Sequence, residues 1–190
     1  MRVQAIALAA IAILACTSDE TRDGTGSSSS GAGGATLYRR NYGEGIPNLA
    51  AANEFHWFAG NFLKYAAVGH SAANLPVDAH ELIAMVAPRF VFIGGGALML
   101  SPPEAVPGDA WVDPPGMFKA AAAASPAWKL LGRTGLESTD LPAERTCLCA
   151  GDIGFRQHQY GHTPKPNWPY FLQFASRHFD RTEQTAARIR

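Results

Sequence analysis

The chain has 190 residues, of which 16 are basic and 16 acidic, and 47% of its side chains are apolar. This composition is typical of one soluble globular domain and excludes a disordered or fibrous chain. A net charge of zero, without a basic run or a pattern of aromatic and basic residues, excludes nucleic acid as a partner.

The first 16 residues predict an export signal. A single Arg2 precedes an apolar run at 5–15 that is too short to span a bilayer. The last four residues of this segment, Ile-Leu-Ala-Cys, fit a lipoprotein cleavage pattern that would lipidate Cys16, although ordinary signal cleavage is an alternative. The prediction is therefore a periplasmic or cell-surface protein that contacts a bacterial membrane only through a lipid anchor.

Residues 17–30 are rich in Ser, Gly and Thr and predict a flexible linker, whereas 31–180 alternate helical patterns with apolar runs. Asp78 is a good N-cap and Glu81 follows three residues later, so 78–86 predict a capped helix. Next comes the continuous apolar run 90–93, which three glycines end, as in a buried parallel strand.

The second half continues this alternation. A helix is predicted at 117–124, and Ser125 and Pro126 cap and open a separate short helix that stops at Gly132. Residues 146–150 predict a strand and 167–180 an amphipathic helix, and 181–190 form a polar tail. The order predicts an α/β fold with a parallel sheet flanked by helices.

Cys147 and Cys149 share one face of the predicted strand but lie too far apart there for an easy disulfide, so we expect two buried thiols. No second pair of Cys or His follows at ligand spacing, and the His80-Glu81 pair lacks the second His of a zinc helix motif. The sequence therefore predicts no metal.

Candidate catalytic residues follow two of the predicted strands. In α/β sheets of this kind, chemistry gathers at the carboxyl ends of the strands. There a carboxylate can orient an imidazole, which takes the proton of a serine hydroxyl. Asp109 would be the orienting acid, with Asp113 as the alternative, and His162 would be the base.

Several segments resemble the glucuronoyl esterases, an α/β-hydrolase family that cleaves esters of 4-O-methyl-glucuronic acid. They agree with the family in order over about 30–180: S-G-A-G-G at 30–34, R-R-N-Y-G-E at 39–44, E-F-H-W-F-A-G-N-F at 54–62, L-P-V-D-A-H-E-L-I-A at 75–84, G-D-A-W-V-D-P at 108–114 and D-I-G-F-R-Q-H-Q-Y-G-H-T at 152–163. The resemblance implies the C-terminal portion of an α/β-hydrolase fold.

The resemblance also implies a sugar pocket formed by Glu54, Trp57 and Trp111, and no cofactor. An indole offers a flat apolar face to a pyranose ring, and a carboxylate accepts its hydroxyl groups. The alternative is that Trp57 and Trp111 are core aromatics. The implied substrate is a uronic-acid carbohydrate ester, as in lignin-carbohydrate material.

The sequence departs from the family at the nucleophile. No G-x-S-R-x-G-K segment precedes the S-G-x-G-G segment, and the acidic residue that many members carry before that segment is replaced by Ser29. Ser71 lies in a G-H-S-A-A stretch that only partly resembles a nucleophile elbow. Two hypotheses follow: a truncated carboxylic-ester hydrolase whose nucleophile is missing, or a non-catalytic exported lipoprotein that binds uronic-acid sugars or a protein partner.

Overall fold

The structure is a computed structural model that describes residues 13–14, 35–51, 55–99 and 108–188. Its strands are β1 (Ile13–Leu14), β2 (Val91–Gly95), β3 (Cys147–Leu148) and β4 (Ile153–Gln157), and its α-helices are α1 (Ile46–Leu49), α2 (Ala79–Ala84), α3 (Pro114–Leu130) and α4 (Trp168–Arg188). Short 3-10 helices lie at Tyr38–Arg40, Phe55–Trp57, Gly60–Ala66, Ala72–Asn74, Ala110–Val112 and Lys165–Asn167. The predicted linker 17–30 and the predicted sites Cys16 and Glu54 lie outside the described residues.

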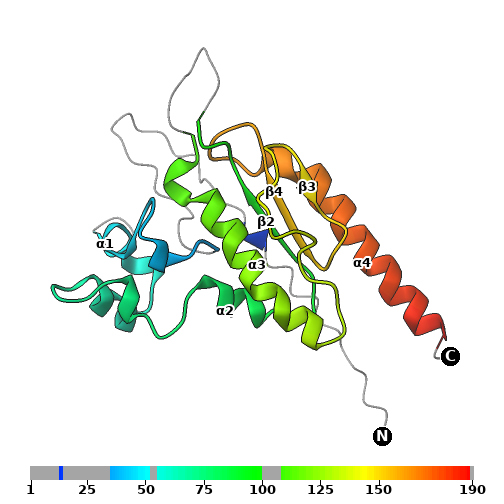
Figure 1. The fold of residues 1–190 in the computed structure, drawn as a ribbon, viewed down its shortest axis with the longest axis horizontal. Helices are drawn as coiled ribbons and strands as arrows, with labels where there is room; N and C mark the ends of the chain where they lie inside the picture. Colours follow the sequence, from blue (N-terminus) through cyan, green and yellow to red (C-terminus); the bar gives the residue numbers. More distant parts are fainter. Residues whose placement is uncertain (1–12, 15–34, 52–54, 100–107, 189–190) are drawn as a thin grey trace, which may run out of the picture.

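The four strands form one sheet in the order β1-β2-β4-β3 (Figure 1). β2 pairs in parallel with β4 on one side and with β1 on the other, while β3 pairs antiparallel with β4. The predicted parallel strand at 90–93 is thus confirmed as β2. β1 comes from the apolar run that predicted an export signal, so two residues of that segment form a strand of the sheet.

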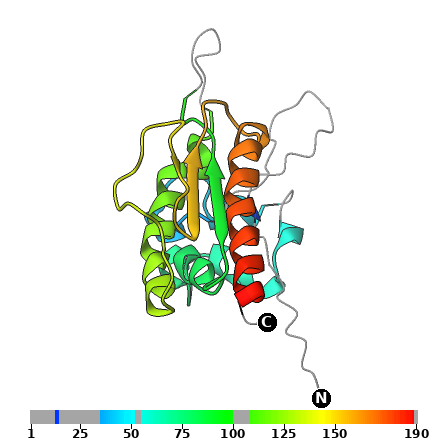
Figure 2. The same cartoon turned by 90° about the vertical axis from the view of Figure 1, so that its right-hand side faces the viewer.

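Helices cover both faces of this sheet, with α3 on one side and α4 on the other (Figure 2). Alternate residues of β2 face opposite sides, as the pleat of a strand requires. Val91 and Ile93 belong to the core cluster that includes α3, whereas Phe92 packs with Phe171 and Phe174 of α4. This two-faced burial explains why the β2 sequence is continuously apolar and confirms the predicted α/β class.

Residues 114–130 form one helix, so the prediction of two separate helices here is wrong. Asp113 caps α3 by accepting a hydrogen bond from the backbone N–H of Gly116 at 3.0 Å, and Pro126 lies inside the helix. Buried residues run along α3 on both sides of Pro126, including Ala121, Ala124 and Trp128. Core packing of this face outweighs the loss of one backbone hydrogen bond at the proline.

α4 begins at Trp168, one residue after the predicted start, and continues to Arg188. The predicted polar tail at 181–190 is therefore helical over most of its length. Residues 181–188 contain neither Gly nor Pro and are mostly good helix formers, so a helix that is already nucleated by packing can propagate through them. Over the described residues, no helix is both long and apolar enough to cross a membrane.

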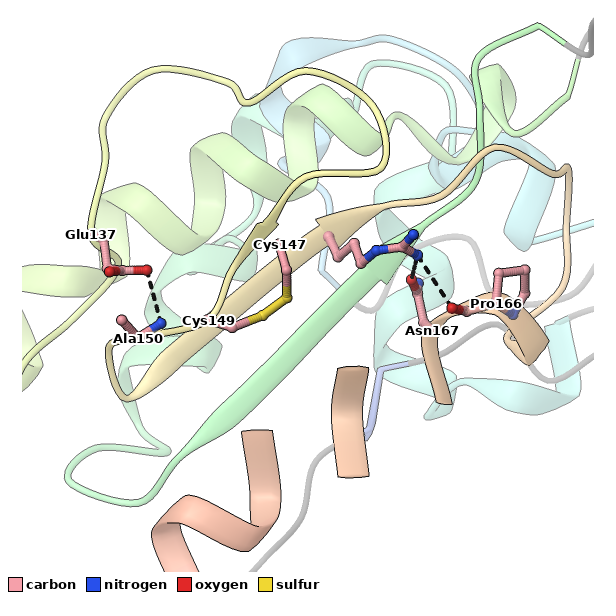
Figure 3. The surroundings of a disulfide bond; sticks show 7 residues. Glu137, Cys147, Cys149, Ala150, Pro166 and Asn167 are labelled. Atoms are coloured by element: carbon pink, nitrogen blue, oxygen red, sulfur yellow. Dashed lines mark hydrogen bonds between the residues drawn. A yellow bond between two sulfur atoms is a disulfide. The ribbon is translucent and has the colours of Figure 1, made fainter. Parts of the chain in front are cut away.

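Cys147 and Cys149 form a disulfide, which corrects the expectation of two buried thiols (Figure 3). The predicted five-residue strand is only Cys147–Leu148, so Cys149 lies just after the strand. The two Cα atoms are 5.4 Å apart, which is shorter than the ~6.6 Å of two residues in an extended strand and within the usual range for disulfides. Both side chains are half-buried.

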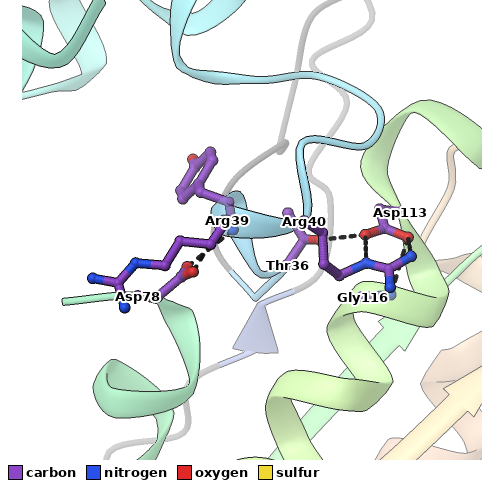
Figure 4. Close-up of polar contacts among 7 residues, drawn as sticks. Thr36, Arg39, Arg40, Asp78, Asp113 and Gly116 are labelled. Carbon is purple, nitrogen blue, oxygen red and sulfur yellow. Dashed lines mark hydrogen bonds and ion pairs between the residues drawn. The ribbon is translucent and has the colours of Figure 1, made fainter. Parts of the chain in front are cut away.

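Two buried carboxylates attach residues 36–40 to the helices (Figure 4). Asp113 accepts from Nε of Arg40 at 2.7 Å and from the Thr36 hydroxyl at 3.1 Å. Asp78 accepts from the backbone N–H of Tyr38 at 2.9 Å and also caps α2, where its own N–H donates to the Glu81 carboxylate at 2.7 Å. The predicted capping box at the start of α2 is confirmed.

Candidate active site

Asp109 and His162 meet at the carboxyl ends of the two central strands. Asp109 follows β2 and His162 follows β4, and the Oδ1 atom of Asp109 lies 2.8 Å from Nδ1 of His162. The aspartate is buried, while 14% of the histidine side chain is exposed. The contact leaves the second ring nitrogen, Nε2, as the atom that can act on a bound molecule.

Backbone groups hold Asp109 in this position. Its second carboxylate oxygen, Oδ2, accepts a hydrogen bond from the N–H of Gly96 at 2.6 Å, and its own N–H donates to the Ala97 carbonyl at 2.6 Å. The N–H of Ala97 donates in turn to the carbonyl of Tyr160, at 2.8 Å, in the loop that carries His162. The two loops are therefore fastened to each other beside the acid–histidine pair.

Gly96 is required at the centre of this junction. A Cβ atom at this position would lie 2.5–2.6 Å from the carbonyl oxygens of Tyr160 and Gly161 and from Oδ2 of Asp109. We expect Gly96→Ala to push Asp109 and the His162 loop apart, and to cost roughly 1–3 kcal/mol of stability through overpacking. Urea unfolding measures the cost, and Gly60→Ala is the matched control because nothing lies within 4 Å of a Cβ at Gly60. Equal stabilities for the two variants would contradict the packing described.

Burial raises the pKa of Asp109 to about 6, and the hydrogen bond from Gly96 opposes this shift. Desolvation disfavours the charged carboxylate, while a donor favours it. Between pH 4 and pH 6 the folded chain therefore holds a proton at Asp109 that the unfolded chain has lost. Stability contributed by this group is fully present below about pH 4 and is lost as the pH rises to about 6.

We expect the unfolding free energy of the wild type minus that of Asp109→Asn to fall by roughly 2–3 kcal/mol from pH 4 to pH 7. The reason is that each unit of difference between the folded and unfolded pKa is worth ~1.4 kcal/mol. Urea titrations of both proteins at pH 4, 5, 6 and 7 measure this difference, in which the contributions of groups that do not contact Asp109 cancel. A difference that grows with pH would mean that ionised Asp109 stabilises the fold, contrary to the direction given by its burial.

Trp111 lies against the histidine. Its ring centroid is 4.7 Å from that of His162, with the two ring planes tilted by 40°. The Trp111 carbonyl accepts from the N–H of Glu44 at 2.7 Å, and Gly43, at φ 70°, passes so close to this carbonyl that a side chain would not fit. The R-R-N-Y-G-E segment thus positions the backbone of Trp111 beside the pair.

His158 is a residue of this region that the sequence analysis missed. It is buried, its N–H donates to the Gly95 carbonyl at 2.9 Å, and its Nδ1 accepts from the N–H of Tyr160 at 3.2 Å. Burial lowers its pKa to about 4, with the Arg156 charge adding to the effect and backbone hydrogen bonds with Thr163 and Tyr160 opposing it. His158 is thus a neutral ring that supports the loop before His162. No motif marks it, because its partners are backbone groups.

Ser71 and Asp113 do not join this group, and the side chain of Trp57 is not described. The backbone of Trp57 lies in the 3-10 helix Phe55–Trp57, but its side chain is outside the described part of the chain. Ser71 is the exposed N-cap of Ala72–Asn74, and its hydroxyl accepts from the N–H of Ala73 at 3.3 Å. Ser71 is thus part of a surface turn and not of a nucleophile elbow. Asp113 pairs with Arg40, so Asp109 is the acid that contacts the histidine.

No group of three or more His, Cys, Asp or Glu side chains that could hold a metal ion exists among the residues that the structure describes. The chemistry that this arrangement offers is proton transfer. A carboxylate that accepts from one ring nitrogen of a histidine orients the ring and stabilises its charged form, so that the histidine can accept a proton from a hydroxyl group or from water.

Comparison with known proteins gives consistent matches. Residues 9–132 match the family model described as "Glucuronyl esterase, fungi". This range includes Asp109 and Trp111 and begins inside the predicted export signal. Export of the protein and lipidation of Cys16 remain predictions. The carbohydrate esterase MZ0003 from an unknown prokaryotic organism is 34% identical over 153 residues, which are 80% of this chain and 32% of that protein.

Solved structures show the same similarity. A CE15 glucuronoyl esterase from Teredinibacter turnerae is 48% identical with a TM-score of 0.68, over 76% of this chain and 32% of that one. A promiscuous CE15 esterase from a marine bacterial metagenome is 30% identical with a TM-score of 0.62, over 75% and 32%. The chain therefore spans about a third of the length of the relatives it matches.

Proposed function

This chain belongs to the glucuronyl esterase family, and we propose that it carries the acid and base residues of a carboxylic-ester hydrolase. The observation that supports this most is the 2.8 Å contact between Asp109 and Nδ1 of His162 at the carboxyl ends of two parallel strands. Family membership supports the reaction class, and this geometry supports the role proposed for each of the two residues.

In the proposed reaction, the Nδ1–H group of His162 donates to the Asp109 carboxylate, which fixes the ring and its tautomer. Nε2 then accepts the proton of the attacking serine hydroxyl as the ester carbonyl is attacked, and it later delivers that proton to the leaving alcohol. Asp109 stays ionised and stabilises the imidazolium that forms between these steps. Because the pKa of Asp109 is about 6, this role is lost in acid solution.

We propose that the substrate is an ester of a uronic acid, of the 4-O-methyl-glucuronate type. Trp111 supports this assignment because its indole lies beside His162, where it can offer a flat face to a sugar ring next to the ester carbonyl. A partly buried tryptophan that is held through its own carbonyl is also a rigid platform, which lowers the entropy cost of binding.

A chimera tests the function. In it, residues 35–188 of this chain replace the matching third of the Teredinibacter turnerae esterase, which is the 48% identical neighbour and whose remaining length this chain does not span. We expect the chimera to hydrolyse the benzyl ester of glucuronic acid, and to prefer it to benzyl acetate, which lacks the sugar. A folded chimera without turnover would refute the proposal.

The second candidate function is sugar binding without turnover, and it is favoured by the partly buried indole of Trp111, whose ring lies 4.7 Å from that of His162. In that case the 190-residue chain binds glucuronate in a calorimeter, Trp111→Ala abolishes the binding, and the folded chimera stays inactive. Turnover by the chimera would favour ester hydrolysis over sugar binding without turnover.

A further inference from the structure

The disulfide between Cys147 and Cys149 lies in a cavity that the ester chemistry does not use. The cavity has a volume of about 400 Å³ and is lined by both cysteines. Its other walls are Glu137, Ala150 and four residues of α4: Tyr170, Gln173, Phe174 and Arg177. These four are spaced as neighbours on one face of a helix, so α4 forms one continuous wall of the cavity.

Little of the fold depends on this disulfide. It joins residues that are two positions apart, so it closes a very short loop and removes little conformational entropy from the unfolded chain. β3, which contributes Cys147, pairs with β4 at only two positions. The bond can therefore open and close while the sheet and α4 stay in place.

The surroundings of the disulfide favour negative charge. Arg177 lines the cavity, and Arg156 lies directly opposite Cys147 in the ladder between β3 and β4. The Arg156 guanidinium lies 3.8 Å from the ring centroid of Tyr170, which also lines the cavity. The Glu137 carboxylate is the one acid of the lining, and it accepts from the N–H of Ala150 at 2.8 Å (Figure 3).

Arg156 is a buried cation of this region. Its described hydrogen-bond partners include no carboxylate. Its Nη1 donates to Oδ1 of Asn167 at 2.7 Å and to the Pro166 carbonyl at 3.3 Å, and its buried Nε has no hydrogen-bond partner in the described structure. These acceptors are neutral, so none of the described hydrogen bonds of Arg156 neutralises its charge. Cys147 is paired with Arg156 across the two strands, and a positive charge near a cysteine stabilises its thiolate.

We propose that Cys147–Cys149 is a thiol-exchange site for a small thiol that carries carboxylate groups. The thiolate of the small molecule attacks the sulfur of Cys149, a new S–S bond forms, and the Cys147–Cys149 bond breaks. Cys147, which pairs with Arg156 across the two strands, leaves as a thiolate and then takes a proton from water. A second molecule of the thiol attacks the mixed disulfide, so two electrons reach the protein, which ends with two thiols, and the oxidised small-molecule disulfide is released.

Trapping and mass spectrometry test this site on the full 190-residue chain. Cys16→Ser removes the third cysteine of the sequence and prevents unrelated disulfides. The oxidised protein is incubated with reduced glutathione, which is anionic, or with 2-mercaptoethanol, which is neutral, at equal thiolate concentrations and then alkylated. Both cysteines lie in the tryptic peptide 146–156, in which fragment ions distinguish adducts of Cys147 from adducts of Cys149.

We expect a glutathione adduct on Cys149 in the folded protein, formed about threefold faster than the adduct of 2-mercaptoethanol, as for one weakly screened charge contact. Arg177→Gln should remove this preference, whereas Arg133→Gln, a change outside the cavity, should keep it. The proposal is overturned if the cysteines do not oxidise to a disulfide in air, if exchange occurs only after unfolding, if the adduct is on Cys147, or if both thiols react equally fast. None of these results depends on esterase activity.

Discussion

Replacing His162 with Ala in the chimera is expected to lower kcat/KM for the benzyl ester of glucuronic acid by about 10³–10⁴-fold, which is the size of effect that general-base catalysis provides. The physical reason is that Nε2 of this ring accepts the proton of the attacking hydroxyl, while Nδ1 is held by Asp109 at 2.8 Å. Steady-state kinetics with the wild-type chimera and the variant measure the loss.

His158→Ala is the matched control for this experiment. His158 is the other histidine of the same loop, and it supports the loop through backbone contacts without touching Asp109 in the described hydrogen bonds. We expect His158→Ala to lower stability and to reduce activity far less than His162→Ala. If the two variants lost activity to the same extent, His162 would have no role beyond holding the loop.

The second large effect concerns the core that carries the site. Trp128 on α3 is fully buried, and its Nε1–H donates to the Arg89 carbonyl, at 2.9 Å, just before β2. Trp128→Ala would leave a large cavity and an unsatisfied carbonyl, so we expect it to reduce the unfolding free energy of the 190-residue chain by about 3–5 kcal/mol. Urea unfolding followed by circular dichroism measures the loss.

Trp168→Ala tests whether this loss comes from burial. The Trp168 side chain is 44% exposed at the start of α4, where it packs edge-on against Phe171. Its removal should cost less than about 1 kcal/mol, as at most surface positions. Equal losses for the two tryptophans would mean that α3 is not packed on the sheet as described.

The parts of the fold that could be predicted from the sequence are those with a strong local signal. The capping residues of α2 and the continuous apolar run of β2 identify both elements, because each pattern has one favourable structural solution. The pairing of Asp109 with His162 was predicted from the resemblance to the family, together with the general rule that the carboxyl ends of parallel strands meet at one edge of a sheet.

Other features depend on contacts that the sequence does not display. Pro126 is a local signal for a helix start, but burial of α3 on both sides of it keeps one helix intact. The disulfide required the chain to bend between the two cysteines, which shortens the distance between their Cα atoms to 5.4 Å, and strand spacing alone does not predict such a bend. His158 lies within the segment at 152–163, but its described hydrogen bonds go to backbone groups, so the segment does not single it out.

The measurement that tests the central claim most directly is a double-mutant cycle in the chimera, with His162→Ala, Asp109→Ala and the double variant assayed on the benzyl ester of glucuronic acid. If Asp109 acts only by orienting His162 and stabilising its imidazolium form, the double variant is no slower than His162→Ala alone. The reason is that the losses of activity caused by removing residues that act as one unit are not additive. Losses that multiply in the double variant would contradict the account, as would a wild-type chimera no faster than His162→Ala.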